Sequence, residues 1–93
     1  MHDRRTIKAA EGVITRVVGD ELVLLDLPRG VYYGLDPVGT RAWELLTGGA
    51  TLGEATATMT AEYEVEAETL LADLDALLRE LETRDLVVVS GGA

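Results

Sequence analysis

The hydrophobic period of this chain changes at Asp36-Pro37, and that change constrains the fold more than any other feature. From residue 13 to residue 35 the sequence consists of β-branched and apolar runs separated by short turn signals. After residue 37, apolar residues recur three and four positions apart, which is the spacing of one helix face. Because a chain of 93 residues has room for a single core, strands followed by helices predict one α+β domain.

Three apolar runs, residues 13–18, 22–27 and 31–35, precede the change. The turn signals between them are Gly19-Asp20 and Pro28-Arg29-Gly30, which are short enough to predict a three-stranded antiparallel meander. The third run alternates, so one of its two side-chain sets is expected to face the core.

Three helices are predicted after the meander. Asp36 is a typical N-cap before Pro37, and Gly48-Gly49 ends this first helix. A capping-box pattern at Thr51 opens a second helix that runs to about Glu62. A third helix over about 66–84 carries an apolar stripe made of Leu70, Leu74, Leu77, Leu78 and Leu81.

The predicted architecture is therefore a three-stranded antiparallel sheet followed by a three-helix bundle, similar to a winged helix-turn-helix. We expect residues 1–11 to be a flexible N-terminal arm, residues 12–89 to form the single domain, and residues 90–93 to be a flexible tail. Residues 86–89, an apolar run, fit a short terminal strand.

Charge and composition exclude several functional classes. The net charge is −9, and residues 61–85 carry nine acidic against two basic residues, which disfavours nucleic-acid binding. The absence of cysteine excludes disulfides and thiol nucleophiles and fits a cytoplasmic protein. The charged N-terminus is not a signal peptide, and no apolar run is long enough to predict a membrane span.

The chain lacks an obvious catalytic set. His2 is the only histidine and Ser90 the only serine, and each lies near one end of the chain. Asp73 and Asp75 are two positions apart on a helix, so their side chains point in different directions and do not share a site. No metal-binding or cofactor motif is present, so we expect neither a metal nor a cofactor, and no enzymatic activity.

The stretch Gly30 to Asp36, GVYYGLD, points to binding instead. The third strand of a meander is a sheet edge, and residues 31–35 contain neither the charge nor the proline that usually protects an edge. An extended peptide could add there as a further strand, with its side chains in pockets beside the third helix. The alternative is that Tyr32 and Tyr33 simply divide between solvent and core.

From residue 12 to residue 89 the chain resembles the PqqD-like family, the RiPP recognition element. The resemblance rests on a G-x-Y-Y-x-L-(D/N) stretch, a small residue before Trp, L-L-x-G, T-x-x-E, a Tyr before the third helix, and the leucines and the Leu-Val pair that follow. These residues are Gly30, Tyr32, Tyr33, Leu35, Asp36, Ala42, Trp43, Leu45, Leu46, Gly48, Thr51, Glu54, Tyr63, Asp73, Leu78, Leu81, Leu86 and Val87. The chain departs from the pattern at Asp85, where the family often has Gly, and at Gly53, a poor helix former.

The resemblance implies an adaptor that binds the leader segment of a ribosomally made precursor peptide, most similar to the stand-alone protein of lasso peptide pathways. It implies that the leader adds as an antiparallel strand between the third sheet strand and the third helix. Implied partners are the leader, a leader peptidase and a cyclase that acts afterwards; nucleic acid and membrane are not expected. An alternative within the family is a PqqD-type chaperone that presents its peptide to a radical enzyme.

The expected peptide-binding residues come from both walls of that groove. Backbone pairing is assigned to Val31, Tyr32, Tyr33, Gly34 and Leu35. The opposite wall is assigned to Leu71, Leu74, Asp75 and Leu78, with Ala67 at the groove mouth; Asp75 or nearby Glu residues would meet a leader Lys or Arg, or the rim. Leu74 has an alternative place, wholly inside the core. Two rival functions stay open: a DNA-binding winged helix and a homodimer formed through the same edge.

Overall fold

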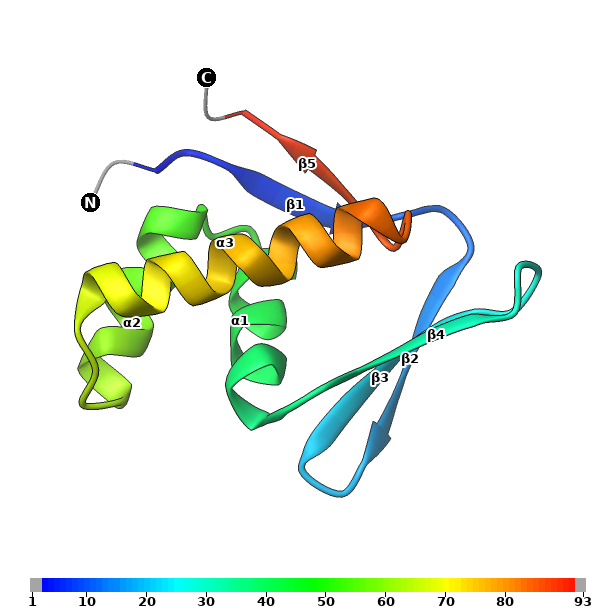
Figure 1. The fold of residues 1–93 in the computed structure, drawn as a ribbon, viewed down its shortest axis with the longest axis horizontal. Helices are drawn as coiled ribbons and strands as arrows, with labels where there is room; N and C mark the ends of the chain where they lie inside the picture. Colours follow the sequence, from blue (N-terminus) through cyan, green and yellow to red (C-terminus); the bar gives the residue numbers. More distant parts are fainter. Residues whose placement is uncertain (1–2, 92–93) are drawn as a thin grey trace.

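The computed structural model describes residues 3–91 and contains five strands and three helices. Their order is β1 (Thr6–Ala9), β2 (Val13–Val18), β3 (Glu21–Asp26), β4 (Val31–Leu35), α1 (Pro37–Thr47), α2 (Leu52–Glu62), α3 (Ala67–Thr83) and β5 (Val87–Ser90). The strands form two separate sheets, and α3 runs along the long axis of the molecule (Figure 1). The predicted α+β class is confirmed, with a three-stranded antiparallel sheet followed by three helices.

The larger sheet has the strand order β2-β3-β4 and is antiparallel throughout. Leu24 of the central strand lies opposite Thr15 on one side and Tyr33 on the other. Gly30 turns the chain into β4 with φ +67°, a left-handed conformation that glycine adopts without strain. This is the predicted meander, and β3, the central strand, buries Leu22 and Leu24.

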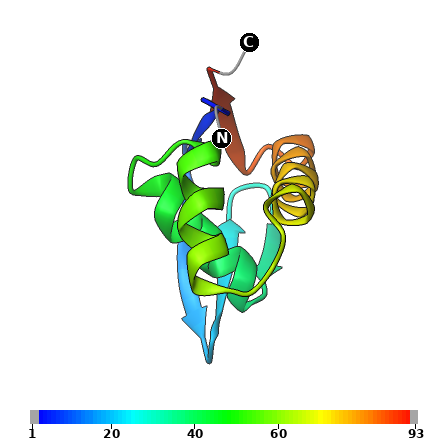
Figure 2. The ribbon, with the colours of Figure 1, turned by 90° about the vertical axis from the view of Figure 1, so that its left-hand side faces the viewer.

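The helix starts follow the predicted caps. The Asp36 carboxylate accepts a hydrogen bond of 2.7 Å from the Gly39 N–H at the start of α1. Thr51 and Glu54 form a complete capping box at the start of α2, with bonds of 3.1 Å and 2.8 Å. Figure 2 looks along α3, whose buried leucines pack in one core with those of α1 and α2.

The smaller sheet corrects the prediction for the chain's two ends. Residues 1–11 were expected to be a flexible arm and residues 90–93 a tail, but β1 pairs antiparallel with β5 from Thr6↔Ser90 to Ala9↔Val87. Ile7 is buried and belongs to the core. The pairing partner lies about eighty positions away in the sequence, and a local pattern does not reveal such a partner. Residues 1–2 and 92–93 lie outside the described residues.

One core joins the helices to both sheets. Its fully buried large side chains come from almost every part of the chain: Leu24, Leu35, Leu52, Met59, Leu81 and Leu86. Trp43, at 7% exposure, is part of this core, as is the leucine stripe of α3 apart from the half-buried Leu77. No helix in the part of the chain that the structure describes has the length and apolar character needed to cross a bilayer.

Candidate functional site

The free edge of β4 is the starting point of the site. In residues 3–91 this strand pairs only with β3, so the backbone N–H and C=O groups that alternate along its other side have no strand partner. The strand, Val-Tyr-Tyr-Gly-Leu, carries neither charge nor proline. Such an edge is open to another extended segment.

Two hollows lie along β4. The first has a volume of about 470 Å³ and is lined by Glu21, Tyr33, Gly34, Leu35, Asp36, Val38, Gly39, Asp73, Leu74 and Leu77. The second has a volume of about 490 Å³ and is lined by Gly30, Val31, Tyr32, Tyr33, Gly34 and Arg84. Because they share Tyr33 and Gly34, they follow the strand from Gly30 to Asp36; together they are called the β4 groove below.

The α3 wall of the groove is made of Asp73, Leu74 and Leu77. Leu74 lay among the predicted wall residues; Asp73 and Leu77 did not. Successive helix residues are about 100° apart, so Asp73 and Leu77 lie on one flank of the leucine stripe.

The remaining α3 residues of the predicted wall do not line either hollow. Leu78 is 2% exposed and lies in the core, while Leu71 is partly buried against it. Ala67 is the first residue of α3 and is half-buried. Leu71 and Asp75 follow Leu74 around the helix on the flank away from Asp73. Of the predicted α3 wall, Leu74 alone lines a hollow, and the peptide-binding role of these residues stays a prediction.

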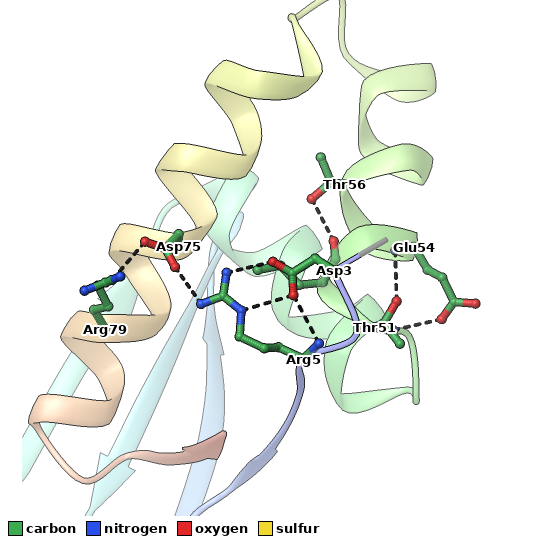
Figure 3. A network of polar contacts seen from close by, with 8 residues as sticks. Asp3, Arg5, Thr51, Glu54, Thr56, Asp75 and Arg79 are labelled. Atoms are coloured by element: carbon green, nitrogen blue, oxygen red, sulfur yellow. Dashed lines mark hydrogen bonds and ion pairs between the residues drawn. The ribbon is translucent and has the colours of Figure 1, made fainter. Parts of the chain in front are cut away.

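The carboxylate of Asp75 already binds two arginine side chains of the protein itself (Figure 3). Its carboxylate accepts a hydrogen bond of 2.6 Å from the Arg5 guanidinium and one of 2.9 Å from Arg79. Arg5 is also bound to Asp3 at 2.8 Å. The same N-terminal segment bonds the start of α2, where the Arg5 carbonyl accepts the Leu52 N–H at 2.7 Å. Asp75 thus fastens the segment before β1 to α3.

Acid should weaken the ion pair between Asp75 and Arg5. The hydrogen bond from Arg5, then that from Arg79, lowers the pKa of Asp75, and Arg5 likewise lowers the pKa of Asp3. A carboxyl with a folded-state pKa below its unfolded one contributes stability above the unfolded value and loses it as the pH falls through the folded one. We expect the free energy of unfolding to fall between about pH 5 and pH 2, less steeply in Asp75→Asn.

Chemical denaturation at a series of pH values checks this expectation. Asp26 and Glu62 also have lowered pKa values because of their arginine partners, so the wild-type slope contains several contributions. Only the difference between wild type and Asp75→Asn in the pH dependence of the unfolding free energy isolates the contribution of Asp75. Parallel curves for the two proteins would show that Asp75 titrates alike in the folded and unfolded chains.

The two adjacent tyrosines have different surroundings. Tyr32 is 73% exposed on the outer face of the sheet, whereas Tyr33 is half-buried and packs against the core together with Val31. The guanidinium carbon of Arg84 lies 5.3 Å from the centroid of the Tyr33 ring, within cation–π range. Val31, Tyr33 and Leu35 are thus the inward set that the alternation of the strand allowed.

Sequence reasoning missed several lining residues of the groove: Glu21, Asp36, Val38, Gly39, Asp73, Leu77 and Arg84. Asp36, Val38 and Gly39 follow β4 directly, so their closeness to its end could have been inferred from sequence adjacency. The place of Glu21 could also have been inferred, because antiparallel pairing of β3 with β4 puts Leu22, and with it the β2–β3 turn, beside Leu35. The orientation of α3, which brings in Leu77 and Arg84, has no local signal.

The described residues contain no arrangement of three His, Asp or Glu side chains able to hold a metal ion. Ser90 lies in β5, away from the groove, and His2 lies outside the described residues. The arrangement offers backbone pairing, apolar contact and acidic groups, which together suit the binding of an extended peptide.

Comparisons with known proteins agree with this geometry. The chain matches a solved structure described as TbiB1 in complex with the TbiA(beta) leader peptide, with a TM-score of 0.80 and 40% identity over 92% of this chain and 98% of that one. A second structure, lasso peptide synthetase B1 complexed with the leader peptide, shares the fold with a TM-score of 0.83. Its identity is 23%, over 88% of this chain and 96% of that one. A search of curated protein sequences gives no match.

The family comparison covers most of the domain. The model described as coenzyme PQQ synthesis protein D (PqqD) matches residues 21–87, from the first residue of β3 to the first residue of β5. The matched range contains β4, all three helices and every residue that lines the β4 groove. The chain belongs to the PqqD family.

Proposed function

We propose that this protein is a non-catalytic adaptor that binds the leader segment of a ribosomally made precursor peptide of the lasso type. The leader adds to β4 as an antiparallel strand and is presented to a processing peptidase, with a cyclase acting afterwards. The observation that carries the proposal is the unprotected edge of β4 with a hollow on either side of Tyr33. The bound leader peptides named for the two similar structures support it.

Each wall of the β4 groove has its own role in this proposal. Val31 to Leu35 supply the backbone pairing, while Tyr33, Leu74 and Leu77 contact apolar leader side chains. The position of Asp73 beside the hollow favours it over Asp75 as the partner of a basic leader residue, because Asp75 already binds Arg5 and Arg79. Ala67, Leu71 and Leu78 are less favoured, since none of them lines either hollow.

The proposed fold includes a winged helix-turn-helix arrangement of the three helices, supported by the short connections between α1, α2 and α3. Its use for DNA is disfavoured by the acidic side chains on α3 and by the net charge of −9. A homodimer through β4 would occupy the edge that the leader needs. Size-exclusion chromatography with and without leader peptide separates these two uses of the edge.

Two measurements test the proposed function. Calorimetric titration with synthetic TbiA(beta) leader peptide should give a Kd at or below the micromolar range, about −8 kcal/mol or tighter. The purified protein should leave a precursor that carries this leader intact, and addition of a leader peptidase should start its cleavage.

Either of two results would contradict the adaptor role. The first is cleavage of the precursor by the purified protein in the absence of a peptidase. The second is the absence of measurable binding to both leader peptides seen in the similar structures. The alternative PqqD-type role differs only in the receiving enzyme, so a radical enzyme that depends on this protein would favour that alternative.

A further inference from the structure

Arg29 joins the turn before β4 to the end of α3. Its guanidinium donates hydrogen bonds to the backbone carbonyls of Arg84, at 2.9 Å, and Asp85, at 3.2 Å. These carbonyls lie at the C-terminus of a helix, where partners are lacking and a positive charge is favourable. The same side chain bonds the carboxylate of Asp26 at 2.6 Å. One arginine therefore connects both walls of the β4 groove.

Asp26 holds this arginine in place. The carboxylate is only 8% exposed and accepts both the Arg29 backbone N–H, at 3.3 Å, and the side-chain Nε–H. Gly30 closes the turn through a bond of 3.1 Å to the Leu27 carbonyl. Leu27 itself is 66% exposed. Among the described residues of this turn, Arg29 alone forms a side-chain hydrogen bond or ion pair with α3 or the residues after it.

Asp85, where the chain departs from the family pattern, also contacts Arg29. Asp85 has φ +57°, a conformation in which glycine is expected and Asp is tolerated. Its carboxylate lies 3.6 Å from the Arg29 guanidinium, and its carbonyl is one of the two acceptors above. The residue therefore gives Arg29 a second acidic neighbour, which glycine would lack.

We propose that Arg29 is a positioning residue for leader binding: it fixes the separation between β4 and the C-terminal end of α3 without touching the peptide. Arg29 lines neither hollow, whereas Tyr33 and Arg84, the residues on either side of the second hollow, lie on the two elements it connects. This inference rests on the proposed function. A groove with a fixed width binds a flexible peptide more tightly than one that must first be ordered.

Three variants test this role. Arg29→Ala removes the connection, and Arg29→Lys keeps a cation for Asp26 but lacks the planar fork that reaches several acceptors at once. Arg41→Ala is the matched control, because Arg41 makes an equally short two-bond contact with Glu62, at 2.9 Å and 2.6 Å, and lines neither hollow. For each protein, the free energy of unfolding, the Kd for the TbiA(beta) leader peptide and the amide exchange of residues 31–35 are measured.

We expect Arg29→Ala to weaken leader binding about tenfold, Arg29→Lys to weaken it by a smaller factor, and Arg41→Ala to leave it within about twofold. Amide exchange in β4 should be faster in both Arg29 variants and unchanged in the control. If wild type binds but the Kd and β4 exchange of Arg29→Ala match those of Arg41→Ala, the positioning role is wrong while the adaptor function stands. If wild type binds neither leader peptide, the adaptor function itself fails.

Discussion

Replacement of Tyr33 by alanine should weaken leader binding by about 1–3 kcal/mol, which is roughly tenfold to more than a hundredfold in Kd. Tyr33 is the one aromatic residue on the inward face of β4 and lines both hollows, whereas Tyr32, on the outer face, lines only the second. Its ring offers a large contact area with few rotatable bonds, so little entropy is lost when a peptide packs against it. Calorimetric titration with the TbiA(beta) leader peptide measures the change.

Tyr32→Ala provides the comparison within the same strand. The Tyr32 side chain is 73% exposed on the outer face, and alanine keeps the backbone groups that pair with an added strand. Its effect on the Kd should therefore be much smaller than that of Tyr33→Ala. Tyr33→Phe, which retains the ring beside Arg84, should bind nearly as well as wild type. Equal losses for the two alanine variants would contradict the assignment of Tyr33 as the anchor.

Tyr32 and Tyr33 lie on opposite faces of β4, and the sequence predicts only part of this arrangement. Alternation along residues 31–35 implied that the pair would separate, but not which tyrosine would face inward. The choice follows from the register, which places Tyr33 opposite Leu24, a residue with no exposed surface. Register depends on turn geometry and on the whole buried face, and these are properties of the folded sheet.

The meander, the helix caps and the leucine stripe were predictable because each depends on residues within a few positions of one another. Strand β1 was not, because its partner β5 lies at the opposite end of the chain. The pairing of Asp75 with Arg5 has no local signal for the same reason, because the two residues are 70 positions apart in the sequence. A stripe of five leucines also covers a wide arc of the helix, so the stripe alone does not reveal which flank faces β4.

Replacement of Leu74 by alanine should have a large effect on stability, because Leu74 lies in the core as well as at the groove. Leu74 is 2% exposed and lines both the first hollow and a small internal cavity of about 10 Å³ next to Ile7 and Trp43. Leu74→Ala should therefore lower the free energy of unfolding by about 2–5 kcal/mol. That is a large part of the roughly 5–15 kcal/mol that stabilises a typical domain, so weaker leader binding by this variant would be ambiguous.

Leu77→Ala separates groove contact from core packing. Leu77 lines the first hollow but is only partly buried, so its truncation should cost about 1 kcal/mol of stability and still weaken leader binding several-fold. Denaturant unfolding and calorimetric titration of the two variants decide between the two roles. Leu71→Ala is the matched control, because Leu71 is also partly buried, lies on the opposite flank of α3 and lines neither hollow. If Leu71→Ala weakened binding more than Leu77→Ala, the leader would contact the flank of α3 that the sequence alone had suggested, and the α3 wall of the groove would have to be reassigned.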